Sequence, residues 1–133
     1  MSAFRTSTAV AAVALAACAP LAVSGTAHAS GGRDAVIRHG SCTGATDWKI
    51  KAKPDDGRIE VEAEIDSNRN GQSWTWALKH DGSVSARGTS RTRGPSGSFS
   101  VERRTVDAAG TDHLTFRAIR PSSGEVCVAR INL

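Results

Sequence analysis

The chain contains three cysteines among its 133 residues, so no more than one disulfide can form within a single molecule. Long apolar segments are also missing. The only extended one, residues 6–23, is rich in Ala and Ser rather than Leu and Ile, which argues against a transmembrane helix. The formal net charge of +4 is small, whereas nucleic-acid-binding proteins usually concentrate much more positive charge on one face. We therefore expect no transmembrane segment and no nucleic-acid partner.

The first residues have the features of a signal peptide. Arg5 supplies a positive start, and a small-residue apolar segment follows it. Ala27 and Ala29 are the small residues that a signal peptidase requires beside the bond it cleaves. The prediction is a secreted protein that begins at Ser30.

The expected organisation is a signal peptide over residues 1–29, a flexible N-terminus over residues 30–34 and one β-sandwich domain over residues 35–133. A competing interpretation concerns Cys18. Residues 15–18, Leu-Ala-Ala-Cys, fit the pattern at which bacterial lipoproteins are cut and acylated. In that case the protein would be anchored through Cys18 instead of being released.

Cleavage after Ala29 removes Cys18 and leaves Cys42 and Cys127, which lie near opposite ends of the product. In an oxidising compartment, two such cysteines are expected to form a disulfide. A bond that closes so long a loop contributes roughly 4–5 kcal/mol in the chain-entropy description, which is comparable to the whole stability of a marginal domain. We therefore predict a Cys42–Cys127 bond that ties the start of the domain to its last strand.

The rest of the sequence alternates between apolar and polar residues with a period of two, which indicates strands and no helix. The clearest strand is 58–66. It follows residues 54–57, Pro-Asp-Asp-Gly, which favour a turn. A four-residue turn there pairs Lys53 with Arg58 and keeps the apolar residues of both strands on one face.

A second hairpin is expected between residues 73–79 and 83–92. A two-residue turn at Asp81-Gly82 would set Trp76 against Arg87. We therefore predict a three-residue turn that also includes His80, with glycine in the left-handed conformation.

The last hairpin repeats the Pro-x-x-Gly pattern at residues 121–124, which sets Arg120 opposite Glu125. Strands are also expected at residues 35–39 and 98–104. Seven or eight short strands joined by Gly, Pro and Asp turns are typical of an all-β fold, an antiparallel immunoglobulin-like sandwich. A small open β-barrel is the alternative.

The three tryptophans, Trp48, Trp74 and Trp76, suggest at first a platform for carbohydrate stacking. All three fall on the apolar side of predicted strands, so packing in the core is the better interpretation. Trp74 is closest to a strand end and is expected to be the most exposed of them.

Residues 66–71, Asp-Ser-Asn-Arg-Asn-Gly, are similar to the start of a calcium-binding loop. Asp66, Asn68 and Asn70 offer oxygen ligands at every second position before a glycine. An EF-hand would have Glu at the twelfth position, where this chain has Ala77, and helices on both sides. A polar loop between two strands is the competing interpretation, so these residues are candidate metal ligands only, and no cofactor is expected.

Arg87, Arg91 and Arg93 share the same parity, so they can extend from one face of the predicted sheet. Guanidinium groups bind phosphate and carboxylate well because they donate two parallel hydrogen bonds. Residues 89–97 are polar and rich in glycine and are expected to be mobile. These arginines are candidate binding residues for an anionic cell-wall polymer or an acidic protein, whereas the alternative is that they only keep a secreted protein soluble.

Residues 40–44, Gly-Ser-Cys-Thr-Gly, have the spacing of a nucleophile elbow, and His39 precedes them. That motif requires a turn from strand to helix, and no helix is expected here. A disulfide-bonded Cys42 is also unable to attack a substrate. His39, His80 and His113 are too scattered to indicate a zinc site. We therefore expect no catalytic residues and no enzyme.

Several segments resemble small secreted proteins of actinobacteria: Cys42 with residues 47–49, and residues 54–61, 66–72 and 95–99. The resemblance covers nearly all of the chain after the signal peptide. It implies a secreted, disulfide-bonded β-domain and lends no catalytic residues.

Three functions are left open by the sequence. The leading hypothesis is a secreted, non-enzymatic module that binds an extracellular macromolecule, with the cell wall as the candidate location. The second is a secreted protease inhibitor that presents residues 89–97, with Arg91 or Arg93 as bait. The third is a small hydrolase.

Overall fold

A computed structural model describes residues 34–133, so the predicted signal peptide and residues 30–33 lie outside the described residues. The described chain forms eight strands: β1 (Val36–Ser41), β2 (Asp47–Asp55), β3 (Arg58–Asp66), β4 (Ser73–His80), β5 (Ser83–Arg91), β6 (Ser98–Val106), β7 (His113–Arg120) and β8 (Glu125–Asn132). Over residues 34–133 there is no helix, and hence none long and apolar enough to cross a membrane.

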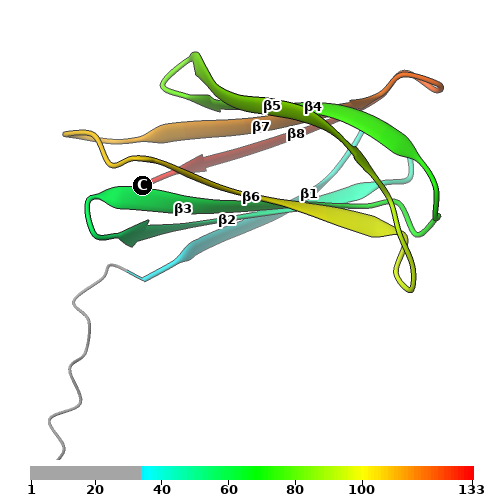
Figure 1. Cartoon of the computed structure of the whole chain (residues 1–133), viewed down its shortest axis with the longest axis horizontal. Helices are drawn as coiled ribbons and strands as arrows, with labels where there is room; N and C mark the ends of the chain where they lie inside the picture. Colours follow the sequence, from blue (N-terminus) through cyan, green and yellow to red (C-terminus); the bar gives the residue numbers. More distant parts are fainter. Residues whose placement is uncertain (1–33) are drawn as a thin grey trace, which may run out of the picture.

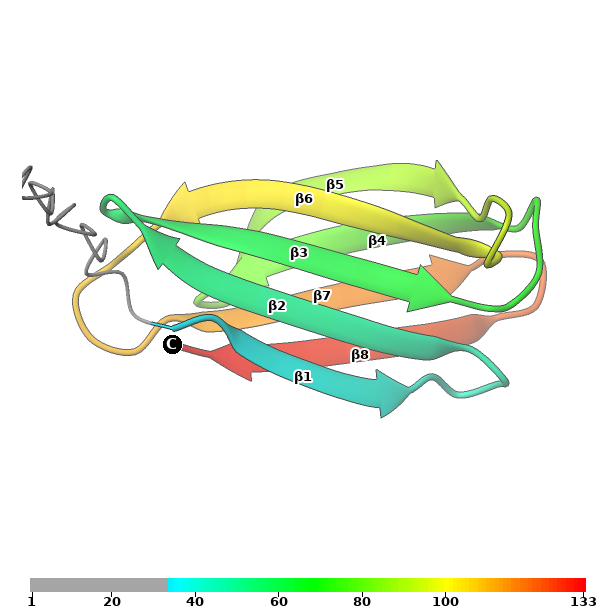
Figure 2. The same ribbon diagram turned by 90° about the horizontal axis from the view of Figure 1, so that it is seen from below.

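The strands form two antiparallel sheets of four that lie face to face (Figures 1 and 2). The first sheet has the order β1-β2-β3-β6, and the second sheet has the order β5-β4-β7-β8. At the two sides of the sandwich, β1 and β2 lie beside β8, and β5 lies beside β6. The predicted all-β sandwich is therefore confirmed.

The core lies between the sheets because alternate residues of each strand point inward. In β3 the inward residues are Ile59, Val61, Ala63 and Ile65, each no more than 1% exposed. Phe116 of the second sheet stacks on Trp76, with 5.7 Å between the ring centroids. Such burial is the main stabilising contribution in a domain of this size.

The turn between β2 and β3 differs from the prediction by two residues. Asp55, and not Lys53, pairs with Arg58. The turn contains only Asp56 and Gly57, which have φ values of 48° and 72°. Two consecutive residues with positive φ define the hairpin turn that Asp-Gly favours, because its twist matches that of the strands.

Pro54 therefore belongs to β2, where it lies opposite Ile59. A proline in a strand removes one N–H group from the ladder, which is tolerated where no neighbouring strand needs that group. Strand β1 reaches only as far as Ala52 along β2, so Pro54 lies beyond it. Because the shift is by two residues, every side chain keeps its predicted face.

The turn between β4 and β5 also departs from the predicted three residues. Asp81 and Gly82 alone form it, with φ values of 48° and 82°. With regular pairing, a two-residue turn would set inward residues of β4, such as Trp76, opposite outward residues of β5. A β-bulge between Leu78 and Lys79, with Ser85 as the extra residue, restores the alternation.

The hairpin of β7 and β8 has the predicted register throughout, with Arg120 opposite Glu125 and Ala118 opposite Cys127. Gly124 closes the turn with a φ of 73°, and its N–H donates to the Arg120 carbonyl at 2.8 Å. The first strand begins and ends later than the predicted 35–39, and β6 extends two residues beyond the predicted 98–104.

Trp76 lies opposite Gly88, whereas the predicted three-residue turn would have set Trp74 opposite that glycine. A Cβ atom on Gly88 would lie 2.7 Å from Cζ2 of Trp76, so the indole covers the bare glycine backbone. Trp74 is fully buried, which corrects the expectation that it is the most exposed tryptophan. That residue is Trp48, which is half-buried at the side of the core.

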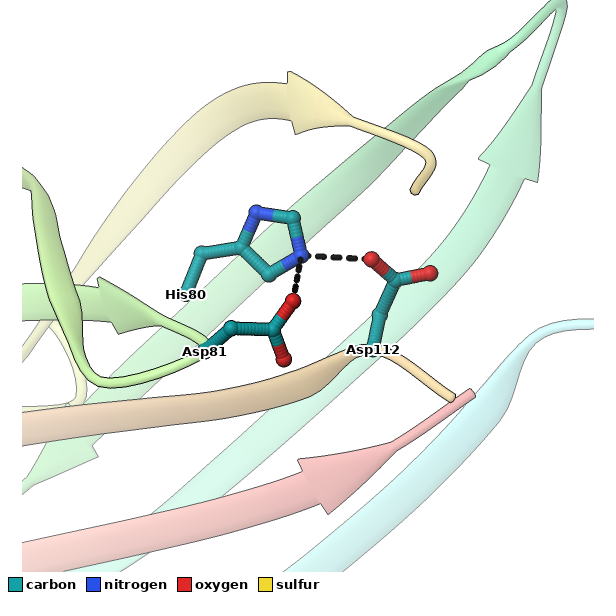
Figure 3. A group of neighbouring side chains, drawn as sticks. All are labelled: His80, Asp81 and Asp112. Atoms are coloured by element: carbon teal, nitrogen blue, oxygen red, sulfur yellow. Dashed lines mark hydrogen bonds and ion pairs between the residues drawn. The ribbon is translucent and has the colours of Figure 1, made fainter. Parts of the chain in front are cut away.

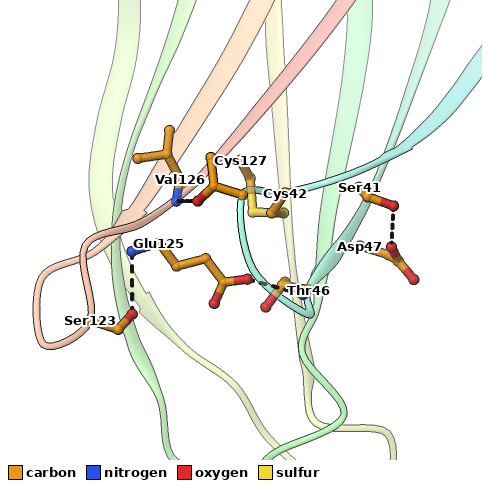
Figure 4. The surroundings of a disulfide bond; sticks show 9 residues. Ser41, Cys42, Thr46, Asp47, Ser123, Glu125, Val126 and Cys127 are labelled. Carbon is orange, nitrogen blue, oxygen red and sulfur yellow. Dashed lines mark hydrogen bonds between the residues drawn. A yellow bond between two sulfur atoms is a disulfide. The ribbon is translucent and has the colours of Figure 1, made fainter.

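Cys42 and Cys127 form the predicted disulfide, with 4.3 Å between their Cα atoms (Figure 4). Cys127 is buried in β8 of the second sheet, and Cys42 follows β1 of the first. The connection formed by residues 42–46 also contacts β8, because the N–H of Thr46 donates to Oε1 of Glu125 at 3.0 Å. The bond therefore links the two sheets at one end of the sandwich.

Candidate functional site

The outward side of the second sheet carries positive charge only. Five exposed cationic residues point outward from its four strands: Lys79 of β4, Arg87 and Arg91 of β5, Arg117 of β7 and Arg130 of β8. Within these strands, all of which the structure describes, the one carboxylate is Glu125, which lies on the inward side. We call these five residues the cationic face.

Strand pairing explains how residues distant in sequence come together here. Ala77 lies opposite Arg87 on one side and opposite Arg117 on the other. Thr115 lies opposite both Lys79 and Arg130. Small or short side chains in the central strands are thus flanked by long cationic ones from all four strands.

The cationic face surrounds a shallow hollow of about 490 Å³. Its floor includes Thr75, Ala77 and Thr115, and four of the five cationic residues line it; Arg91 lies outside. Within residues 34–133, none of the five forms an ion pair with a carboxylate. Their positive charge therefore has no carboxylate partner among the described residues.

The three arginines predicted to form one patch are divided between two places. Arg87 lines the hollow on the cationic face. Arg91 and Arg93 line a second hollow of about 470 Å³ at the side where β5 meets β6. Arg91 still points outward with Arg87, as its parity predicts, but Arg93 follows the end of β5 and pairs with Ser98.

Residues 89–97, which were expected to be mobile, are held by hydrogen bonds. Residues 89–91 belong to β5. Thr92 is 1% exposed; its Oγ1 donates to the Arg69 carbonyl at 2.5 Å and accepts from the Gln72 N–H at 2.9 Å. An inhibitory loop must present an exposed, extended segment to a protease, so this geometry offers the inhibitor hypothesis no support, and it stays a prediction.

The candidate calcium ligands lie in the connection between β3 and β4. Oδ1 of Asp66 accepts a hydrogen bond from the N–H of Asn68 at 2.9 Å, and Asn68 has a φ of 55°. A carboxylate that bonds the backbone two residues later is typical of a polar turn. Asn68 and Asn70 are exposed. Calcium binding by these three residues stays a prediction.

A cluster that the sequence did not predict lies at the end of the core, where β4 turns into β5 (Figure 3). Nε2 of His80 lies 2.5 Å from Oδ1 of Asp112 and 3.3 Å from Oδ2 of Asp81. On the other side of the ring, Nδ1 lies 3.0 Å from Oγ1 of Thr105. The side chain of Asp112 is buried at 2% exposed, that of His80 is largely buried at 13%, and that of Asp81 is 44% exposed.

This cluster has the order hydroxyl, imidazole, carboxylate that is also found in catalytic triads. In a triad the hydroxyl must reach a substrate. Thr105 is only 8% exposed and points into the end of the core, so its hydroxyl is shielded from a substrate. The elbow-like segment around Cys42 has a disulfide-bonded sulfur, as expected.

Local sequence reasoning missed both groupings because strand order determines them. Arg117 and Arg130 join Arg87 only through the pairing of β4 with β7 and of β7 with β8. The sequence nevertheless indicates the cationic face, since the outward positions of β7 and β8 contain arginine and no carboxylate. The dipeptides His80-Asp81 and Asp112-His113 are the corresponding signal for the buried cluster.

The chain matches no protein-family model, and a comparison with curated proteins finds no significant match. The disulfide and the β-rich fold agree with the resemblance to small secreted actinobacterial proteins, but kinship with them stays a prediction. The function must therefore be argued from the geometry of the sites.

Proposed function

We propose that the protein is a non-enzymatic extracellular module whose cationic face binds an anionic polymer, of the class of phosphate-bearing cell-wall polymers. The observation that carries this proposal is the one-sided charge of the second sheet: five exposed cations point outward and no carboxylate lies among them. A polymer with a negative charge on each repeating unit would satisfy several of these cations at once.

The chemistry of the face supports an oxyanion as the ligand group. Four of the five cationic residues are arginines, whose planar guanidinium donates two parallel hydrogen bonds to phosphate or carboxylate. The hollow is shallow and open to one side of the sheet, which suits an extended chain better than an enclosed small molecule. Charges spread over all four strands also favour contact with successive units of a polymer.

An extracellular location is part of the proposal. It is supported by the signal-peptide features of residues 1–29 and by the disulfide, which persists in oxidising compartments. An immunoglobulin-like topology is also proposed. From β2 onward, the two sheets have the strand orders β2-β3-β6 and β5-β4-β7-β8. The pairing of β3 with β6, the second and fifth strands when β2 is counted as the first, agrees with a Greek-key sandwich. The fold by itself does not decide the function, so the proposal rests on the charges of the cationic face.

Binding to a glycerol-phosphate polymer, followed by fluorescence anisotropy, tests the proposal. We expect the double variant Arg87→Gln/Arg117→Gln to bind up to roughly thirtyfold more weakly, because each lost exposed charge pair is worth about 0.2–1 kcal/mol. Higher ionic strength should weaken binding of the unaltered protein, since exposed charges are screened.

The matched control is Lys51→Gln/Lys53→Gln, which removes the same charge from the outward side of the first sheet. It should bind as the unaltered protein does. Equal loss in both double variants would show that net charge alone matters and would overturn the proposal. Polyglutamate and duplex DNA serve as comparison polymers, and stronger binding to DNA would replace the proposed ligand class.

A further inference from the structure

The buried cluster at the end of the core brings three potential metal ligands together. His80 contributes Nε2 from the last residue of β4, Asp81 contributes Oδ2 from the turn, and Asp112 contributes Oδ1 from the connection before β7. These atoms all lie within 4.8 Å of one another. We propose that they bind one divalent cation of the zinc type.

Charge balance is the first argument for a cation. Two carboxylates face a single imidazole nitrogen, which carries at most one proton and can donate it to one of them at a time. Within residues 34–133, no Lys or Arg forms an ion pair with Asp81 or Asp112. Because Asp112 is 2% exposed, water compensates its charge poorly. A divalent cation bound between the two carboxylates would neutralise both.

The second argument is that the ligands are already positioned. Oγ1 of Thr105 lies 3.0 Å from Nδ1 of His80, where it can accept the Nδ1 proton and leave the Nε2 lone pair directed at the carboxylates. A hydrogen bond at the opposite ring nitrogen is the usual way in which a metal-binding histidine is oriented. Thr105 belongs to β6, so both sheets take part in the site.

The carboxylates are held by backbone groups as well. Oδ1 of Asp81 accepts the N–H of His113 at 2.9 Å, which leaves Oδ2 directed at His80. Oδ1 of Asp112 accepts the N–H of Ala108 at 3.2 Å. Asp112 also exchanges two backbone hydrogen bonds with Leu133, each 3.1 Å long. The site is therefore built on fixed elements on both sides.

One of the two ligand separations at His80 already matches zinc, and the other needs a small adjustment. Bond lengths of about 2.0–2.2 Å place tetrahedral ligand atoms roughly 3.3–3.6 Å apart. The separation of His80 Nε2 and Asp81 Oδ2 is 3.3 Å, so this pair fits as it stands. The separation from Asp112 Oδ1 is 2.5 Å and needs to widen by about 1 Å, which a small carboxylate rotation achieves. Water supplies the fourth ligand, since Asp81 is partly exposed.

Zinc titration of the purified protein by isothermal calorimetry tests this inference, with the melting temperature as a second readout. We expect one saturable site per chain and a higher melting temperature with zinc, because a ligand that binds only the folded state stabilises it. Magnesium should bind more weakly because it prefers oxygen ligands to imidazole. The variants Asp81→Asn and Asp112→Asn should each weaken zinc binding by roughly tenfold or more.

Asp81→Asn is the decisive variant, because its side-chain oxygen can still accept the His113 N–H and so preserve the turn. Two control variants should bind zinc as the unaltered protein does. Asp47→Asn makes the same change at an exposed carboxylate of β2, and His39→Gln removes an exposed histidine of β1. The inference is overturned if zinc does not saturate a site, if Asp81→Asn and Asp112→Asn bind it unchanged, or if either control loses binding to the same extent.

Discussion

The outward sides of the two sheets have the same architecture but arrange their charges differently. On the first sheet, Glu60 lies between Lys53 and Arg104 on the neighbouring strands. On the second sheet, Thr115 lies between Lys79 and Arg130. The first sheet thus places a carboxylate between two cations, whereas the second places a neutral hydroxyl between them.

This difference separates charges that are paired within the fold from charges that have no partner among the described residues. Arg104 lies 3.2 Å from Asp55 and 3.4 Å from Glu60, and Lys49 lies 3.5 Å from Glu64. These pairs are largely solvent-exposed and each contributes little stability, but they partly cancel the positive charge of the first sheet. The second sheet gains no such cancellation. Its cations therefore repel one another, and the proposed anionic polymer would relieve this repulsion.

The largest expected effect concerns the bond that holds the two sheets together. Without the Cys42–Cys127 disulfide, we expect the free energy of unfolding to fall by about 4–5 kcal/mol, because an 85-residue loop is released in the unfolded chain. Urea unfolding of the reduced protein and of the Cys42→Ala/Cys127→Ala variant measures this loss. A change below about 1 kcal/mol in both would contradict the view that the bond is a main stabilising link between the sheets.

A smaller loss of stability is expected when a glycine that faces a tryptophan is replaced by alanine. Each sheet has one such glycine. Gly88→Ala should lower the free energy of unfolding by about 1–3 kcal/mol, because the new methyl group meets a Trp76 indole that cannot move. That indole stacks on Phe116, and its Nε1 donates to Ser90 Oγ at 3.0 Å. The guanidinium of Arg103 also covers it, 5.1 Å from the ring centroid.

Gly40→Ala on the first sheet is the matched comparison. Its methyl group would meet Trp48 even more closely, but this indole is half-buried on an edge strand pair and can rotate toward solvent. We expect the free energy of unfolding to fall by less than about 1 kcal/mol, since replacing a strand glycine also removes an entropic penalty. Thermal unfolding of both variants measures the difference. A larger loss for Gly40→Ala would show that the side of the sandwich is as tightly packed as its centre.

The local part of the fold was predictable from the sequence. The alternation of Ile59, Val61, Ala63 and Ile65 identified the core face of β3 correctly, because a period of two fixes which side each residue takes. The β7–β8 register was also correct, since Pro121 and Gly124 define their turn without ambiguity. The β2–β3 turn was placed two residues too early because Pro54 has the properties of a turn residue.

The sites were harder to predict because they depend on pairings between distant strands. The alternation along β5 alone predicts that Arg87 and Arg91 point to the same side of the sheet, and this is correct. It also grouped Arg93 with them, which fails because the strand ends at Arg91 and Arg93 belongs to the next turn. The meeting of His80 with Asp112 requires β4 to pair with β7, and no local pattern encodes that choice.

The smallest expected change in stability gives the sharpest test of the contrast between the sheets. Thr115→Glu would place a carboxylate between Lys79 and Arg130, as Glu60 lies between Lys53 and Arg104 on the first sheet. Two new opposite-charge pairs contribute about 0.2–1 kcal/mol each, partly offset by the lower strand propensity of Glu. We therefore expect a net change in the free energy of unfolding of less than about 1 kcal/mol.

The effect of the same variant on binding should be much larger. A fixed carboxylate competes with the polymer for two cations and repels its anionic groups, so affinity for the glycerol-phosphate polymer should fall roughly tenfold. Thr115→Gln is the control, because it has the same length without the charge, and it should bind as the unaltered protein does. Equal weakening by Glu and Gln would mean that shape at the centre of the hollow decides binding. Charge would then not be what distinguishes the second sheet from the first.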